Sequence, residues 1–240
     1  MNVLKCLFFS LSTVILSGCY VNGERIKGNG NMSTDTRTVS YADRIESLGS
    51  FNVEIIVGNT PSVRIEGESN LIPYIQTENT DGVLRIKVKK GYNIQTSRPL
   101  KIFVTTPKLE LVTLAGSGDI KGNGKFTGAS QLEVNIAGSG NVSLEVNTPE
   151  VKADIAGSGD IILVGETRDL SVEIAGSGNF DGMRMMSENV NISIAGSGDV
   201  NVFADKKLDV DIAGMGDINY KGNAVVSKSI AGSGKISKVD

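Results

Sequence analysis

The sequence predicts an all-β fold, a parallel β-helix (β-solenoid), from a repeat, an alternating apolar pattern and the lack of helical periodicity. The tetrapeptide Ala-Gly-Ser-Gly, once with Met in place of Ser, recurs every 18 to 22 residues. Its copies begin at Ala115, Ala137, Ala156, Ala175, Ala195, Ala213 and Ala231. A fixed period near twenty is typical of solenoids, in which each repeat forms one coil and stacked neighbours bury its apolar side chains.

Alternation around each tetrapeptide predicts short strands. The first and third residues before the alanine are apolar, as in Ile174 and Val172, and polar Glu173 stands between them. Another apolar residue, such as Phe180, follows the last glycine by two positions. A period of two with one buried face indicates a strand, and we expect about three short strands per coil. A leucine-rich repeat is excluded because its leucine and asparagine spacing is missing, which leaves a β-sandwich as the structural alternative.

The first residues predict a lipoprotein signal peptide over residues 1–18. Lys5 precedes an apolar run that is too short to span a bilayer, and the run ends in Leu16-Ser17-Gly18-Cys19. This ending resembles the bacterial lipobox, so we expect cleavage between Gly18 and Cys19 and attachment of lipid, including palmitate, to Cys19. The alternative is an ordinary secretory signal with a chance cysteine.

The predicted lipid would hold the protein at a membrane surface. Tyr20 follows the cysteine in place of the aspartate that retains lipoproteins at the inner membrane, so we expect an outer-membrane lipoprotein of a diderm bacterium. The sequence leaves open whether the protein faces the cell surface or the periplasm.

Composition excludes several classes of function. The chain has 24 Lys and Arg, 27 Asp and Glu and no His. Loss of the signal peptide removes only Lys5, and the resulting net charge of −4 argues against nucleic acid as a partner. Without histidine, and with Cys19 as the only remaining thiol, the commonest catalytic bases and metal ligands are missing. We therefore expect no catalytic residues, no metal and no cofactor.

Pattern changes along the chain suggest the domain organisation. Residues 19–38 are polar and glycine-rich, which predicts a flexible tether. Residues 39–240 form the predicted solenoid domain, with regular repeats over residues 109–236. Residues 39–107 alternate without the tetrapeptide, and we expect them to form irregular first coils that cap the solenoid.

The tetrapeptide glycines predict tight corners, because glycine adopts positive φ without steric cost. A phosphate-binding loop would instead require a helix N-terminus after the glycines, and a strand residue follows here. The residue after each corner would stack into a ladder of hydrogen-bonded turn side chains: Asp119, Asn141, Asp160, Asn179, Asp199 and Asp217. A calcium-binding edge is the alternative interpretation of this ladder, because carboxylate oxygens suit that ion.

Catalysis is a further alternative, since some parallel β-helices cleave polysaccharides. Asp154, Glu173 and Asp211 occupy equivalent outward positions, interrupted by Ser193. A solvated charged face explains these residues without chemistry, because they recur only as the repeat recurs.

Several motifs together resemble one bacterial family. They are the serial Ala-Gly-Ser-Gly-Asp/Asn copies, Gly23-Glu-Arg-Ile-Lys-Gly-Asn-Gly30, Phe51-Asn-Val-Glu-Ile, Leu71-Ile-Pro-Tyr-Ile75 and Lys89-Lys-Gly-Tyr92. The chain is similar in these segments to the family called putative auto-transporter adhesin, head GIN domain, over about residues 39–235. The resemblance implies a right-handed β-solenoid on the envelope of diderm bacteria and supplies no catalytic residues.

The combined expectation is a lipid-anchored, non-enzymatic adhesin or surface-binding module of the cell envelope. Its partners would be the membrane, through the lipid on Cys19, and a glycan or protein ligand. A periplasm-facing scaffold or sensor lipoprotein is the first alternative and a carbohydrate-active enzyme the second. The sequence leaves the oligomeric state open.

Overall fold

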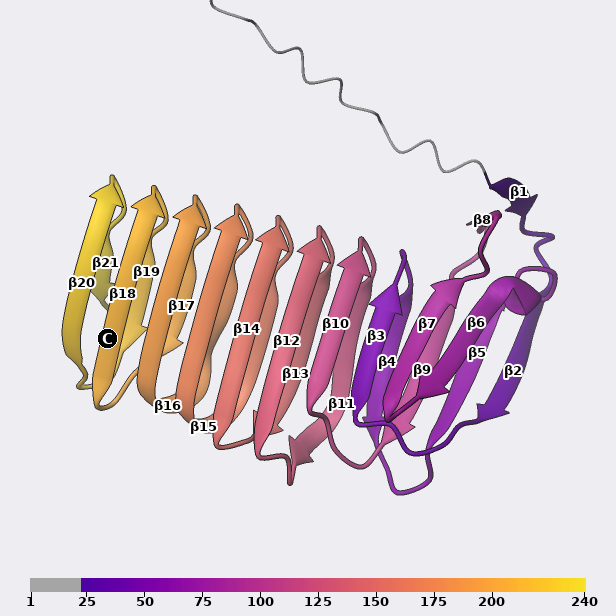
Figure 1. Cartoon of the computed structure of the whole chain (residues 1–240), viewed down its shortest axis with the longest axis horizontal. Helices are drawn as coiled ribbons and strands as arrows, with labels where there is room; N and C mark the ends of the chain where they lie inside the picture. Colours follow the sequence, from indigo (N-terminus) through magenta and orange to yellow (C-terminus); the bar gives the residue numbers. More distant parts are fainter. Residues whose placement is uncertain (1–22) are drawn as a thin grey trace, which may run out of the picture.

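The protein forms a rod of stacked β-coils, seen in a computed structural model that describes residues 23–240 (Figure 1). Each regular coil crosses two facing layers of one continuous 19-stranded sheet, here called the first sheet and the second sheet. A strand in the first sheet ends at the tetrapeptide corner, the chain turns, and the next strand runs in the second sheet. The predicted parallel β-solenoid is confirmed.

The first sheet of the regular coils consists of strands that each end in the tetrapeptide. In stacking order it contains β10 (Leu111–Gly116), β12 (Gln131–Gly138), β14 (Glu150–Gly157), the second half of β15 (Ile161–Gly176), the second half of β16 (Phe180–Gly196), β18 (Lys207–Gly214) and β20 (Val225–Gly232). Every pairing between these neighbours is parallel, and each tetrapeptide alanine lies opposite the alanine of the next coil.

The second sheet of the regular coils starts just after each corner. It contains β11 (Asp119–Thr127), β13 (Asn141–Asn147), the first halves of β15 and β16, β17 (Val200–Phe203), β19 (Ile218–Lys221) and β21 (Ile236–Lys238). A coil therefore has two strands, and the expectation of about three was wrong. In β15 and β16 backbone pairing continues through the second bend, from Gly165 opposite Met185 to Thr167 opposite Ser187, so no third strand separates there.

The core fills the space between the two sheets with the predicted alternating apolar residues. Val172 and Ile174 from the first sheet and Ile161, Leu163 and Phe180 from the second are all at most 2% exposed. Burial of each such side chain contributes about 1.5–3 kcal/mol, and neighbouring coils must cover it for this gain to be realised.

In the final described coil Val226 holds the core position, because it lies five residues before Ala231, as Leu208 lies five before Ala213, and the two pair across the coils. The preceding residue, Val225, is 75% exposed. Lys228 lies opposite buried Val210, and no further strand of the described chain covers it.

A segment before β10, here called the cap (residues 24–106), extends both sheets in an order that differs from the sequence. β3 (Arg44–Leu48) pairs in parallel with β10, and β4 (Asn52–Val57) pairs in parallel with β11. On their other sides lie β7 (Val83–Val88) and β9 (Lys101–Thr106), again in parallel. The coil that comes later in the chain is thus the outer one.

Antiparallel strands close the end of the rod. β5 (Ser62–Glu68) pairs with β9, β2 (Met32–Thr38) pairs with β5, and β6 (Ile75–Thr80) pairs with β7. A short 3-10 helix, η1 (Ile72–Tyr74), connects β5 to β6. These pairings correct the expectation that residues 39–107 are only irregular coils, because β5, β2 and β6 run opposite to the strands they cover and do not repeat the coil.

The expected tether is also shorter than the composition suggested. β1 (Glu24–Lys27) pairs in parallel with β8 (Tyr92–Gln95) in a small separate sheet, and β2 belongs to the cap. Residues 24–38 are therefore part of the fold and not a flexible tether, because their backbone groups pair with strands far along the chain. Within residues 23–240, none of the structure is a helix with the length and apolar character required to cross a bilayer.

Candidate binding surface

Each tetrapeptide forms a corner that only glycine permits. Gly157 has φ of +135°, and a Cβ at this position would overlap the carbonyl oxygen of Gly138 in the preceding coil. The backbone N–H of Ser158 donates to that same carbonyl at 2.9 Å. No helix follows the corner, so the predicted structural role of the glycines is confirmed. The one Met in the series, Met215, is 66% exposed.

The residues after the corners form a continuous hydrogen-bonded ladder. The backbone N–H of each member donates to the side-chain Oδ1 of the member one coil earlier, at 2.9–3.2 Å. In addition, the amide Nδ2 groups of Asn141 and Asn179 donate to Asp119 and Asp160, both at 2.9 Å. The ladder contains Asp119, Asn141, Asp160, Asn179, Asp199 and Asp217, and Lys235 donates its backbone N–H to the last of them at 3.0 Å.

The ladder has one more member, which the sequence pattern did not reveal. Asn52 accepts a hydrogen bond from the backbone N–H of Asp119 at 3.3 Å. It follows Leu48-Gly-Ser-Phe51, which stacks on the first tetrapeptide corner: Leu48 lies opposite Ala115, and the Gly49 N–H donates to the Ala115 carbonyl at 2.9 Å. A Cβ on Gly116 would overlap the carbonyl of Gly49. The available signal was Gly49-Ser50 with Asn52 two residues later. It was hidden because Leu48 and Phe51 replace the first alanine and the last glycine of the tetrapeptide.

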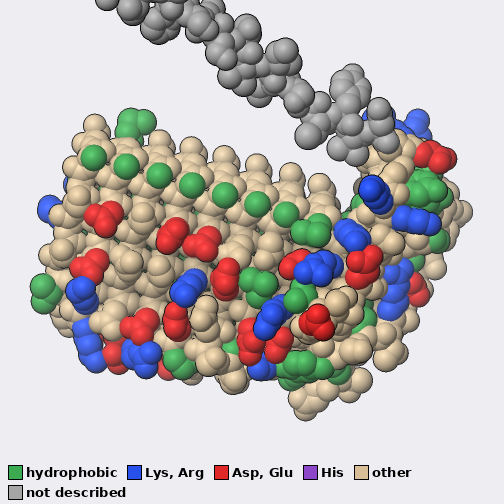
Figure 2. Space-filling model, in the orientation of Figure 1, with side chains coloured by type: hydrophobic (Ala, Val, Ile, Leu, Met, Phe, Trp, Pro, Cys, Tyr) green, Lys and Arg blue, Asp and Glu red, His purple; other side chains and the backbone are tan. Residues whose placement is uncertain are grey.

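A groove runs beside the corners on the outer face of the first sheet. It has a volume of about 450 Å³ and is bounded on one side by the tetrapeptide alanines Ala137, Ala156, Ala175 and Ala195. Figure 2 shows the corresponding row of hydrophobic side chains along one edge of the rod, with acidic side chains next to it. The polar side is formed by Asn135, Asp154, Glu173 and Ser193, which face one another across successive strands.

The acidic residues of this groove repel each other. Asp154 lies directly opposite Glu173 on the neighbouring strand. Partial burial raises the pKa of Asp154, and the negative charges of Glu173 and Glu133 raise it further, while Lys152 acts in the opposite direction. The arrangement favours a ligand that brings positive charge or hydrogen-bond donors to the groove. Asp211, the third carboxylate considered in the sequence, is separated from Glu173 by Ser193.

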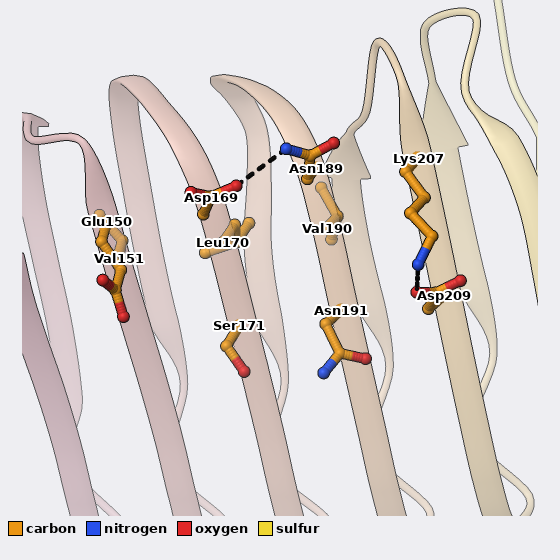
Figure 3. Close-up of a pocket in the computed structure, with 10 residues that line it drawn as sticks. All are labelled: Glu150, Val151, Asp169, Leu170, Ser171, Asn189, Val190, Asn191, Lys207 and Asp209. Atoms are coloured by element: carbon orange, nitrogen blue, oxygen red, sulfur yellow. Dashed lines mark hydrogen bonds and ion pairs between the residues drawn. The ribbon is translucent and has the colours of Figure 1, made fainter.

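A second, smaller groove of about 210 Å³ lies farther from the corners on the same sheet (Figure 3). Asn189 donates its amide Nδ2 to Asp169 at 2.8 Å, and Lys207 forms an ion pair with Asp209. The hydrogen bond from Asn189, followed by that from Arg168, lowers the pKa of Asp169. No short motif marks these residues in the sequence, since Asn189 and Asp169 meet only between coils and Lys207 pairs with Asp209 within β18.

Two further predictions concern lipid attachment and metal binding. Gly18 and Cys19, the expected cleavage and lipidation site, lie outside the described residues. Across residues 23–240 no cluster of three or more His, Cys, Asp or Glu side chains is positioned to hold a metal ion. The carboxylate oxygens of the ladder that accept hydrogen bonds are occupied by backbone and amide donors, and calcium binding there stays a prediction.

The chain belongs to the family described as putative auto-transporter adhesin, head GIN domain, whose sequence profile matches residues 43–224. Membership of this adhesin-like family indicates a protein of the cell envelope. The family expected from the sequence motifs is therefore confirmed. No curated protein sequence matches the chain.

Solved structures share the fold over nearly the whole chain. A putative adhesin from Bacteroides fragilis is 24% identical with a TM-score of 0.83, covering 89% of this chain and 100% of its own. A putative lipid binding protein from Parabacteroides distasonis is 30% identical with a TM-score of 0.73, covering 90% and 100%. A putative adhesin from Parabacteroides merdae is 24% identical with a TM-score of 0.72, covering 91% and 100%.

Proposed function

We propose that the protein is a lipid-anchored, non-enzymatic adhesin or surface-binding module of the outer membrane, which binds a glycan or protein ligand through the first sheet. The observation that carries this proposal is the groove beside the alanine row. It repeats the same combination of a flat apolar edge and polar side chains on successive coils. Repeated weak contacts along a rigid rod add up to strong attachment, as adhesion requires.

The groove has the polar and apolar surfaces that both ligand classes use. Its alanines offer a flat surface to the apolar face of a sugar ring or to small side chains, and Asp154, Glu173 and Ser193 accept hydrogen bonds. The family membership and the likeness to structures described as adhesins support this function. The related protein described as lipid binding supports a role at a membrane.

Ligand binding can be tested with paired charge reversals. The double variant Asp154→Lys with Glu173→Lys changes the groove, and Glu145→Lys with Glu166→Lys makes the same charge change at exposed positions of β13 and β15 outside it. Glycan arrays and matrix-protein panels should identify a ligand whose affinity falls at least about tenfold in the first variant only. Equal loss in both variants, or none in either, would contradict the groove as the binding surface.

Anchoring and exposure need separate measurements. Labelling with a palmitate analogue should mark the wild-type protein and not Cys19→Ala. Protease treatment of intact cells should digest the rod if it faces outward. Protection until lysis would overturn the adhesin proposal and favour the periplasm-facing scaffold or sensor.

A further inference from the structure

The two ends of the molecule differ in charge, although the protein as a whole is acidic. Residues 109–240 contain 11 Lys and Arg against 18 Asp and Glu, whereas residues 23–108 contain 12 against 9. On the face shown in Figure 2, Lys and Arg side chains lie on the cap and along the rod, whereas most of the acidic side chains lie along the rod. The end of the molecule that contains the cap thus has a net charge of +3, and the remainder of the rod has a net charge of −7.

Within the cap, a group of unopposed positive charges lies on β1 and on the segments that flank β8. Residues 23–30 and 89–98 contain one acidic residue, Glu24, and five exposed basic residues. These five are here called the basic cluster: Arg25, Lys27, Lys89, Lys90 and Arg98. Parallel pairing of Glu24 with Tyr92 and of Lys27 with Gln95 brings the two segments together.

The basic cluster has no acidic partner in the described chain. Ten ion pairs occur among residues 23–240, and none includes a member of the cluster. The buried carboxylate of Glu68 is close to Arg98 but accepts hydrogen bonds from Ser97, Gly30 and the Arg98 backbone instead. Five positive side chains therefore remain available to an external anion.

Aromatic side chains stand next to the cluster. Lys89 Nζ lies 5.7 Å from the centroid of the Tyr92 ring, and Tyr92 contacts Tyr74 with ring centroids 4.7 Å apart. Tyrosine with neighbouring lysine is typical of surfaces that meet the headgroup region of a membrane, because the ring is apolar and its hydroxyl polar.

The position of the cluster along the chain determines which anion it meets. Glu24 follows Cys19 by five residues, so an extended chain could separate them by at most about 18 Å. If the proposed lipid on Cys19 is inserted, β1 is held within about two Debye lengths of the membrane surface. The rest of the rod is free to extend away from it.

We propose that the basic cluster binds anionic lipid headgroups of the membrane that holds the anchor, so that the cap lies against the bilayer and the acidic rod points away. This inference deepens the proposed function and rests on its lipid anchor. The lipid supplies attachment and the cluster supplies orientation, which presents the groove of the first sheet to ligands beyond the membrane.

The test uses the mature chain from residue 19 with Cys19→Ser, which keeps every described strand and removes the lipid. Co-sedimentation is measured with phosphatidylcholine vesicles with and without about 30 mol% phosphatidylglycerol, since anionic lipids attract juxtamembrane lysines. The protein should bind the anionic vesicles at least about tenfold better, and about 0.5 M NaCl should abolish the difference.

Two quadruple variants with the same net charge separate a specific surface from general attraction. Arg25→Glu, Lys27→Glu, Lys89→Glu and Lys90→Glu together should lower binding at least tenfold, because each basic residue near the surface contributes about fivefold. Lys221→Glu, Lys228→Glu, Lys235→Glu and Lys238→Glu at the other end of the rod should change it less than twofold. A glutamine version of the first variant should be intermediate, and unchanged thermal unfolding would show that the cap stays folded.

Equal loss in both quadruple variants, or equal binding to neutral and anionic vesicles, would overturn the proposal. Because the tested protein carries no lipid, this result is independent of palmitate labelling. Failure of the labelling experiment would instead remove the anchor and leave the vesicle result standing as a property of the cap.

Discussion

In the regular coils from β10 to β21 every strand pairs in parallel with its counterpart one coil away, whereas the cap contains three antiparallel pairings. The regular coils pair each residue with one 18 to 22 positions distant, while β2 and β5 bring together residues such as Asp35 and Ile65 without any repeat. The rod is thus built from coils that repeat the same parallel pairing, and it ends where the cap strands pair in the opposite direction.

The difference teaches how a solenoid avoids unlimited stacking. A parallel coil leaves the next set of backbone donors and acceptors open, and such an edge invites further strands. In the cap, β5 covers β9 and β2 covers β5, so the stack ends in strands of opposite direction. The stability of the regular coils should therefore depend on positions that recur, and that of the cap on single contacts.

The largest effect is expected from a corner glycine of the regular coils. Gly157→Ala should lower the free energy of unfolding by about 4 kcal/mol or more, because the added Cβ would overlap the Gly138 carbonyl and φ is positive. Urea denaturation followed by circular dichroism measures the loss.

Gly128→Ala is the matched control. Gly128 also has positive φ, at +82°, but no atom lies within 4 Å of an added Cβ, so only the backbone cost of about 1–2 kcal/mol is expected. If the two substitutions cost the same, close stacking of corners would not be what requires glycine in the rod.

The second effect concerns the cap and its buried carboxylate, Glu68. Hydrogen bonds from the hydroxyl and backbone of Ser97, and from the backbones of Gly30 and Arg98, lower its pKa to about 2. Because the folded-state pKa lies below the ordinary value of 4.5, the charged form stabilises the cap above about pH 4.5. That stability should be lost as pH falls from about 4.5 toward 2.

Glu68→Gln should remove this pH dependence and speed amide exchange in β2 and β5 at neutral pH. Exposed Glu78, which pairs with Lys87 at 2.7 Å, provides the control variant Glu78→Gln, and it should leave exchange in β2 and β5 unchanged. Slowed exchange after Glu68→Gln would contradict the role of the carboxylate as a link between cap segments.

The third effect tests the ladder of the regular coils. Asp160→Ala removes the acceptor for the backbone and amide N–H groups of Asn179, which should cost about 1 kcal/mol in thermal or urea unfolding. Asp205→Ala, an exposed acid outside the ladder, should cost less than about 0.5 kcal/mol.

The wild type and Asp160→Ala also distinguish a hydrogen-bonded turn ladder from a calcium-binding edge. For a turn ladder, about 1 mM Ca²⁺ should leave the Tm of the wild type unchanged. A rise in Tm with Ca²⁺ that disappears in Asp160→Ala would support the calcium alternative instead.

The smallest effect is expected in the groove. Asp154→Asn should stabilise the protein by about 0.5 kcal/mol at pH 7, because it removes repulsion from Glu173 directly opposite. The raised pKa of Asp154 means that this gain should grow as pH rises through that pKa and vanish in acid. Asp211→Asn, whose neighbours across the sheet are Ser193 and Ser229, should have almost no effect.

Sequence reasoning succeeded for features that every coil repeats. The corners, the ladder from Asp119 to Asp217 and the buried positions around Val172 were predicted because local alternation and a fixed period specify them. It failed at the margin of the repeat, where the corner before Asn52 has a changed motif. Of the groove, the sequence predicted only the row of outward carboxylates, and not the hollow between that row and the exposed alanines.

The sequence by itself determined the period, the corners and the parallel stacking, because each requires only a residue and its equivalent in the adjacent coil. Only the tertiary structure decided that β7 and β9 lie outside β3 and β4, that residues 24–38 fold into the cap, and that Glu68 joins three segments. These contacts link positions that are tens of residues apart and belong to no sequence repeat. A local pattern therefore cannot predict which strand lies at the end of the stack.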